Sequence, residues 1–150
     1  MCSVVTENVP AILRENVVTV KAFVVRDGRL LCIQNSKGRW DAPGGRIDCP
    51  ETILDALRRE IREELGVELA TIDLNHPWVW DWQFESKSRP LIQNIVGIGW
   101  PCTLASDTFH PDPEECAAHQ WVTATELQAL DMHEGHKAGY FRWMQSQGLA

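Results

Sequence analysis

Three acidic residues, Glu60, Glu63 and Glu64, stand close enough in the sequence to act together. On a helix with ~100° between successive residues, their carboxylates share an arc of about 100°. That arc overlaps the edge of an apolar face to which Leu57 and Ile61 belong. Partly buried like charges resist joint ionisation, and a divalent cation would remove the conflict. Because carboxylate oxygens are hard ligands, the cation that they favour is Mg²⁺ or Mn²⁺.

The same acids could instead form a solvated stripe with screened charges, which is the commoner meaning of an acidic cluster on one helix. The residues around them favour the metal site. Every position of a longer pattern is filled: Gly45, five residues, Glu51, seven residues, then Arg59-Glu60-Ile61-x-Glu63-Glu64-x-Gly66-Val67. So many specified residues rarely meet at fixed spacing by chance, which makes the pattern a specific one.

This segment, residues 45–67, resembles the Nudix box of the Nudix hydrolases, the MutT-like family. The stretch Trp40-x-x-Pro43-Gly44-Gly45 fits the same family. The resemblance spans residues 17–130 and leaves the first sixteen and the last twenty residues outside it. It implies an α+β protein with the Nudix fold, in which a mixed β-sheet is sandwiched between α-helices (α/β/α).

The resemblance implies that water attacks a phosphoanhydride of a nucleoside diphosphate linked to a further group, with Mg²⁺ or Mn²⁺ as cofactor. Carried over by position, Glu60, Glu63 and Glu64 would hold the metal, and one of them would act as base. The carbonyl of Gly44 is a further candidate ligand. Arg59 would orient the carboxylates and completes the candidate catalytic set with Glu60 and Glu63. A divalent cation neutralises a polyphosphate and makes water a better nucleophile near neutral pH.

The resemblance also implies three residues that shape the loop and helix, and one more acid. Gly45 begins the loop, Glu51 would brace it, and Gly66 stands where a left-handed residue ends a helix. Members of the family often supply one more carboxylate from a loop before the last strand. Glu115, six positions before Trp121, suits that role best, and a solvated loop acid is the competing interpretation.

Two arginines are candidates for binding the phosphates of a substrate. Arg46 lies inside the box loop, whereas Arg89 lies in a turn between two strands, where an exposed surface role is the stronger interpretation. His133 and His136 lack the spacing of a metal motif. We expect them to be exposed imidazoles at the start of a helix.

Trp78, Trp80 and Trp82 alternate, so they share one face of a strand. They could stack on a base, fill a core or cover an interface between two copies. Packing is favoured because aromatic stripes mostly bury area. We prefer the interface of a homodimer, because an exposed apolar face on a hairpin is a liability.

The elements that position these residues alternate between strands and helices, which predicts an α+β domain with a mixed sheet. Residues 1–16 read as a loose arm or short edge strand. The expected strands are 17–25, 30–34, 67–74, 78–84, 91–104 and 119–122, with an Asp27-Gly28 hairpin turn after the first. A long helix starts at Thr52 and a second opens at Thr123. The C-terminal region 131–150 contributes a third, over residues 135–147.

Composition limits the class of protein. The 150 residues predict one domain, and none of the apolar runs approaches the ~18 residues of a membrane span. With 21 acidic against 14 basic residues the net charge is −7, which argues against a long nucleic-acid partner. Five cysteines without a CxxC pair and a first segment without a leader pattern predict reduced thiols in the cytoplasm.

The resemblance to the Nudix hydrolases thus implies a metal-dependent pyrophosphohydrolase, with nucleoside triphosphates as the first choice of small-molecule substrate. ADP-ribose, other nucleotide sugars and dinucleoside polyphosphates are alternatives, because a fold does not decide its substrate. A non-catalytic nucleotide sensor is a rival from another class, and the complete set of acids argues against it. An RNA-decapping enzyme is a second rival, which the absence of a basic stripe disfavours.

Overall fold

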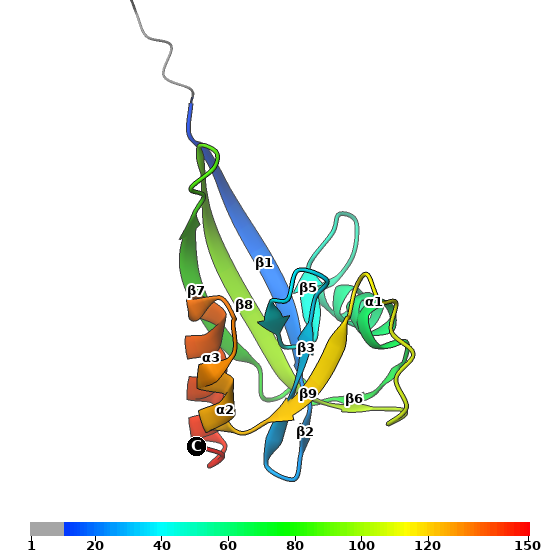
Figure 1. Ribbon diagram of the computed structural model, residues 1–150. Coiled ribbons are helices and arrows are strands. Elements are labelled where there is room, and N and C mark those ends of the chain that lie inside the picture. The colour runs from blue at the N-terminus through cyan, green and yellow to red at the C-terminus, as the bar shows by residue number, and fades with distance from the viewer. Residues whose placement is uncertain (1–10) are drawn as a thin grey trace, which may run out of the picture.

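The computed structural model describes residues 11–150, and its longest strands form a mixed sheet (Figure 1). Strand β1 (Leu13–Phe23) is parallel to β8 (Leu91–Leu104) and antiparallel to the short β5 (Gly44–Arg46). β7 (Trp78–Glu85) and β6 (Leu69–Ile72) both pair antiparallel with β8. β8 is the longest strand and lies between β1 and β7. One end of these three strands projects from the molecule, and β8 runs from that end into the body of the protein (Figure 1).

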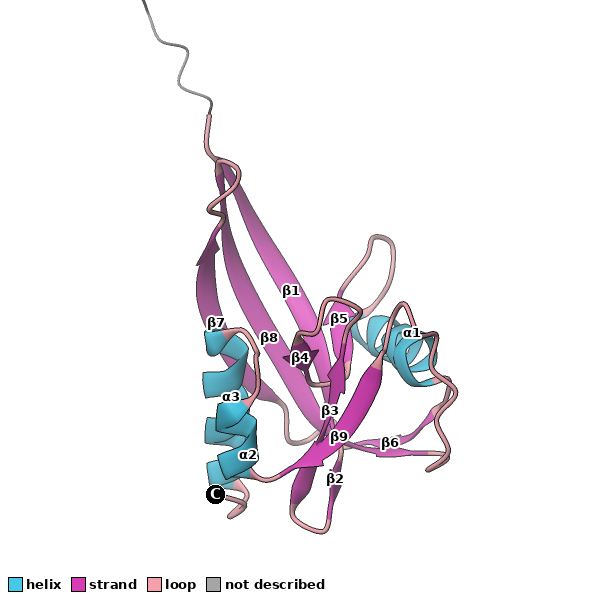
Figure 2. Ribbon diagram, viewed as in Figure 1, coloured by secondary structure: helices cyan, strands magenta, loops and turns pink. Residues whose placement is uncertain are grey.

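A second sheet crosses the first and is antiparallel throughout. It consists of β2 (Val25–Arg26), β3 (Arg29–Gln34), β4 (Trp40–Asp41) and β9 (Ala118–Val122). Helix α1 (Ile53–Leu65) lies on one side of the strands, and α2 (Ala124–Ala129) and α3 (Glu134–Ser146) lie on the other (Figure 2). The predicted mixed sheet between helices is therefore confirmed.

Helix α1 begins and ends where its sequence predicts. Thr52 Oγ1 accepts a hydrogen bond from the backbone N–H of Asp55 at 3.2 Å, which satisfies one of the free donors of the first turn. Gly66 adopts a left-handed conformation with φ 66°, and its N–H bonds to the carbonyl of Arg62. Leu57 and Ile61 are fully buried against β1 and β3, so the helix presents a fixed face to the sheet.

The first strand begins four residues earlier than the sequence analysis placed it. β1 pairs with β8 from Leu13 onward, so of the two alternatives expected for this segment residues 13–16 form the edge strand and not the loose arm, while residues 1–10 lie outside the described part. The pairing is polar as well as apolar, because the amide of Gln93 donates to the Glu15 carboxylate at 2.8 Å. An apolar pattern alone could not reveal it.

Two apolar clusters lie on either side of the main sheet. One packs α1 against β1 and β3, and the other packs α2 and α3 against Phe23 and Trp80. The four cysteines in the described part, Cys32, Cys49, Cys102 and Cys116, are unpaired. No helix among residues 11–150 is long and apolar enough to cross a membrane.

Candidate active site

The three helix acids are buried to very different degrees. Glu64 is only 7% exposed, whereas the side chains of Glu60 and Glu63 are 16% and 46% exposed. The interpretation as a solvated stripe is therefore wrong for Glu64 and Glu60. Both carboxylates face the inner side of α1, as the overlap of the acidic and apolar arcs predicts.

Two glycines of β5 bring the backbone against these acids. The N–H of Gly44 donates to Glu64 Oε1 at 2.7 Å. At Gly45 an added Cβ would lie 2.5 Å from Glu60 Oε1, so a side chain there would displace the Glu60 carboxylate. Gly44 has φ 136°, and a Cβ there would lie 1.9 Å from the carbonyl oxygen of Val20. Gly45 thus allows the close approach of β5 to α1, and Gly44 the close approach of β5 to β1.

Arg59 holds the exposed side of the cluster together. Its Nη1 donates to Glu60 Oε1 at 2.9 Å and to Glu63 Oε2 at 3.1 Å. Its other nitrogens make two hydrogen bonds to Glu51, of 3.0 and 2.7 Å. Glu51 also accepts from the backbone N–H of Asp48, so it ties the loop to Arg59. These hydrogen bonds lower the pKa of Glu51 to about 2.

The inner acids are short of positive charge. Burial raises the pKa of Glu64 well above its usual value, although the Lys21 ammonium opposes the shift. Burial also raises the pKa of Glu60, against the effect of Arg59. Carboxylate oxygens are hard donors, and the negative charge of this poorly solvated cluster is only partly balanced by Lys21 and Arg59. Such a cluster fits a divalent cation.

The side chains do not yet enclose a cation. Within residues 11–150 no three His, Cys, Asp or Glu side chains are grouped closely enough to form a ready metal site. In this arrangement Glu60 and Glu63 both turn toward Arg59, and the Gly44 carbonyl accepts from Lys21 Nζ at 3.3 Å. A cation would therefore compete with Arg59 and Lys21 for these oxygens.

Glu60 and Glu64 open into a cavity of about 290 Å³ that Glu115 also lines, and we call it the acid cavity. The structure thus brings the loop acid predicted from the sequence to the same space as two of the helix acids. Asp41, Gly44 and His133 belong to the same lining. Glu63 does not, because it lies at the outer edge of the cluster.

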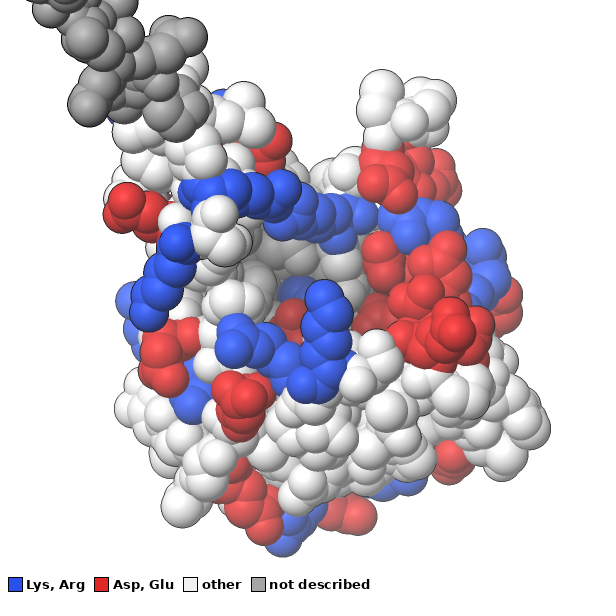
Figure 3. Space-filling model, turned by 45° about the horizontal axis from the view of Figure 1, so that its top comes forward, with Lys and Arg blue, Asp and Glu red and all other residues white. Residues whose placement is uncertain are grey.

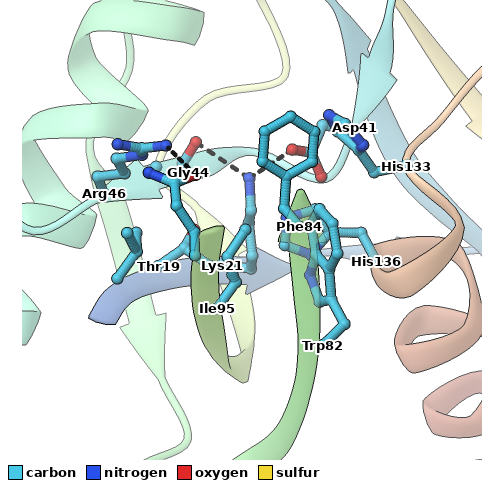
Figure 4. Close-up of a pocket in the computed structure, with 13 residues that line it drawn as sticks. Thr19, Lys21, Asp41, Gly44, Arg46, Trp82, Phe84, Ile95, His133 and His136 are labelled. Carbon is cyan, nitrogen blue, oxygen red and sulfur yellow. Dashed lines mark hydrogen bonds and ion pairs between the residues drawn. The ribbon is translucent and has the colours of Figure 1, made fainter. Parts of the chain in front are cut away.

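A second cavity of about 300 Å³ shares Asp41, Gly44 and His133 with the acid cavity. Aromatic side chains form one side of it, and we call it the aromatic cavity. Figure 4 shows Trp82, Phe84, His133 and His136 on that side, facing Thr19, Gly44 and Arg46 across Lys21. Its full lining is Val17, Thr19, Lys21, Asp41, Gly44, Gly45, Arg46, Trp82, Phe84, Gln93, Ile95, His133 and His136.

The two arginines predicted to bind phosphate are placed differently. Arg46 lines the aromatic cavity beside the box loop. Arg89 lies in the turn between β7 and β8, at the far end of the hairpin, and lines neither cavity. Figure 3 shows Lys and Arg side chains around the central hollow and a group of Asp and Glu side chains beside it, on the side of α1. The structure therefore does not bring Arg89 to the site.

The tryptophan face is covered by α3 of the same chain. Trp78 Nε1 donates to the carbonyl of Gly139 at 3.1 Å, and Trp80 is 3% exposed. Gly139 lets the helix approach, since a Cβ there would lie 2.6 Å from the indole of Trp80. The preference for a homodimer interface on this face is therefore wrong. Trp82 lines the aromatic cavity, whereas Trp78 and Trp80 line neither of the two cavities described above.

A buried lysine was missed by the sequence analysis. Lys21 is 3% exposed, and its Nζ donates to Asp41 Oδ2 at 2.8 Å and to the carbonyls of Ala42 and Gly44 at 3.2 and 3.3 Å. Burial alone would raise the pKa of Asp41, but Lys21 and a hydrogen bond from Tyr140 bring the pKa below its usual value. The available signal was one charged residue inside an apolar strand.

We expect Lys21→Met to lower the free energy of unfolding by about 2 kcal/mol, because it leaves the Asp41 carboxylate without its counter-charge. The figure is below that for a fully enclosed pair, since the Asp41 side chain is 36% exposed. Urea unfolding measures the change. Adding Asp41→Asn should restore part of it, and Lys37→Met, in an exposed turn, is the control. Equal stability of Lys21→Met and Lys37→Met would contradict the role of the pair.

The two histidines of α3 also lie differently from the expectation. His133 and His136 line the aromatic cavity, and burial lowers the pKa of His136 to about 4. The prediction of exposed imidazoles is wrong, because β7 packs along the helix on the side where they project. Nothing in the spacing of the two histidines could indicate this packing.

Comparison with known proteins agrees with this geometry. The family model described as NUDIX domain matches residues 15–144, a longer span than the 17–130 expected from the sequence. The nucleoside triphosphatase NudI of Enterobacter sp. (strain 638) is 34% identical over 103 residues, 65% of this chain and 70% of that protein. The 8-oxo-dGDP phosphatase NUDT18 of Danio rerio is 39% identical over 71 residues, 43% of this chain but only 22% of that protein.

Solved structures share the fold at low identity. The solution structure of the E. coli ORF135 protein matches with a TM-score of 0.67 at 22% identity, over 91% of this chain and 96% of that one. The MutT protein from Methanosarcina mazei Go1 matches with a TM-score of 0.68 at 17% identity, over 93% and 100% of the two chains. The expected arrangement of sheet and helices is thus that of known MutT structures.

Proposed function

The chain belongs to the Nudix hydrolase family, whose members cleave phosphoanhydrides, and we propose that its own substrates are nucleoside triphosphates, cleaved with the help of Mg²⁺ or Mn²⁺. The observation that carries the proposal is the burial of Glu60 and Glu64 against the glycines of β5. Two carboxylates with raised pKa values at one cavity are poorly explained by packing alone.

The cation would be held by Glu60, Glu64 and Glu115, with the Gly44 carbonyl and Glu63, at the outer edge of the cluster, as further candidate ligands. When bound, it neutralises phosphate charge and lowers the pKa of water for attack on phosphorus. The chain's own residues do the positioning. Arg59 keeps Glu60 and Glu63 in place through one guanidinium nitrogen, and Glu51 anchors that guanidinium to the loop.

The shape of the site supports an extended nucleotide as the substrate. The aromatic and acid cavities share part of their lining, so one ligand can reach from the first into the second. Trp82 and Phe84 offer flat apolar surfaces for a base. Arg46, at the same cavity, is placed for charge-assisted hydrogen bonds to phosphate oxygens.

The name of the Enterobacter relative supports triphosphates as the first choice. A substrate panel tests that choice: four nucleoside triphosphates, ADP-ribose, a sugar nucleotide and a dinucleoside polyphosphate, each at the same concentration with Mg²⁺. We expect the largest kcat/KM for a triphosphate, with monophosphate and pyrophosphate as products. A larger kcat/KM for ADP-ribose or a dinucleoside polyphosphate would contradict it.

Turnover should rise from acid toward mildly alkaline pH. Glu60 and Glu64 must lose their protons before they can hold a cation, and burial raises the pKa of both. The protonated forms therefore persist to higher pH than for ordinary glutamates, and activity is lost as the pH falls through that range. The profile of kcat/KM against pH at saturating Mg²⁺ measures this. An optimum well below neutral pH would contradict the assignment.

A further inference from the structure

His136 is fixed in one tautomer by its neighbours. It is 7% exposed, and Trp80 Nε1 lies 3.2 Å from its Nδ1. An indole N–H can only donate, so Nδ1 must be the acceptor. The hydrogen-bond network therefore assigns the imidazole proton to Nε2. The low pKa that burial gives His136 agrees with a neutral ring at pH 7.

The remaining nitrogen, Nε2, belongs to a side chain that lines the aromatic cavity. His136 Nε2 takes part in no hydrogen bond with the residues that the structure describes. It is also not fully enclosed, because Trp82 Nε1 is the one fully enclosed side-chain nitrogen or oxygen without a partner among residues 11–150. Since His136 lines the cavity, its Nε2–H is a donor left for a ligand. The ring is held firmly, stacked on Tyr140 at 5.6 Å between centroids.

An acceptor lies at the same end of the cavity. Asp41 Oδ2 accepts from Lys21, while Oδ1 accepts from Tyr140 and the N–H of Ala42. A carboxylate has about four acceptor positions, so Oδ2 can accept once more. Lys21 has no donor to spare, because its three hydrogen bonds go to Asp41, Ala42 and Gly44. Next to His136 the cavity thus offers a donor, His136 Nε2–H, and an acceptor, Asp41 Oδ2.

We propose that His136 is a specificity-determining residue that reads a nucleobase, its Nε2–H donating to a carbonyl oxygen or ring nitrogen while Asp41 accepts from the adjacent N–H. The inference rests on the proposed function for the identity of the ligand as a nucleotide. Trp82 and Phe84 line the cavity with their rings nearly perpendicular, at 84°, so the base stacks on the face of one ring and meets the edge of the other. Trp80 is a positioning residue, because its indole N–H keeps the imidazole proton on Nε2.

Binding of nucleoside 5′-monophosphates without turnover tests this role. The probes are GMP, AMP, UMP and CMP, with ribose 5-phosphate as the base-free control, titrated into the full chain. His136→Phe should weaken binding of the tightest monophosphate about tenfold, the loss of one hydrogen bond to a buried partner. Ribose 5-phosphate binding should not change. His136→Gln, which keeps a side-chain N–H, should recover most of the loss, and His76→Phe in an exposed turn is the control.

A second measurement does not depend on the folding of a variant. In the wild type labelled with ¹⁵N-histidine, NMR should show His136 Nδ1 without a proton and Nε2 with one, and the tightest monophosphate should shift the Nε2–H signal. Trp80→Phe should lose the single tautomer. A proton on Nδ1, or equal affinities of wild type and His136→Phe for all four monophosphates, would overturn the proposal. If triphosphates are still hydrolysed in that case, the proposed function stands and this role alone fails.

Discussion

Glu64→Gln should reduce turnover roughly 100-fold or more, beyond the loss usual for residues that only support a metal ligand. The amide keeps an acceptor for the Gly44 N–H, so the loop should hold its place. It cannot supply the negative charge that a cation needs. Steady-state kinetics with saturating Mg²⁺ measure the effect, and Glu68→Gln, an exposed acid just after α1, is the control. Turnover close to that of the wild type would remove Glu64 from the metal site.

The same substitution should stabilise the metal-free protein. Burial raises the pKa of Glu64 in the folded state. A group of this kind adds stability below its unfolded pKa and loses that contribution as the pH rises through the folded value. The variant's advantage in Tm should therefore be absent in acid and grow toward pH 8. Mg²⁺ should raise the Tm of the wild type more than that of the variant. A difference in Tm between the variant and the wild type that falls as the pH rises would contradict the burial of a carboxylate with too little positive charge around it.

Gly45→Ala and Gly44→Ala should fail in different ways, although the glycines are neighbours. At Gly45 the added Cβ meets the end of the Glu60 side chain, 2.5 Å away, which can move aside. The protein should fold with Glu60 displaced, and turnover should fall about 100-fold, as expected for a misplacement of ~1 Å. Thermal unfolding and kcat, measured on the same preparation, separate the two effects.

At Gly44 the added Cβ meets backbone, 1.9 Å from the Val20 carbonyl oxygen, and φ is 136°. Strand β5 cannot stay paired with β1, so the free energy of unfolding should fall by about 3 kcal/mol or more. Gly28→Ala is the matched control, because it has φ 73° but open space around it, and should cost only about 1 kcal/mol. Equal stability losses at Gly44 and Gly28 would show that the approach of β5 to β1 is not what requires glycine.

Local features of this chain could be predicted from the sequence because their causes are local. The ends of α1 follow from a threonine cap and a terminal glycine, and the turn at Asp27-Gly28 has the positive φ values, 49° and 73°, that its residues favour. The side of α1 on which Glu64 lies follows from helical periodicity. The placement of Glu60, Glu63 and Glu64 relative to Arg59 and Glu51 could be predicted because all five residues lie on α1 or in the loop before it.

The remaining features depend on elements far apart in the chain. Lys21, Asp41 and Tyr140 come from β1, β4 and α3, and none of them belongs to a recognisable spacing. Whether Trp80 meets a second copy or its own chain was decided by where α3 packs. The path of the chain likewise decides that Arg46 lies at the site and Arg89 does not. The aromatic cavity, and with it His136, therefore emerged only from the fold.

The most direct test of the metal-dependent mechanism is a single reaction followed through removal and return of the cation. Wild-type protein is mixed with a nucleoside triphosphate and Mg²⁺, excess EDTA is added, and Mg²⁺ is then restored, while monophosphate and pyrophosphate are measured throughout. The account predicts that both products form at equal rates, stop with EDTA and resume with Mg²⁺. Product formation that continues unchanged in EDTA, or nucleotide binding without any product, would contradict it.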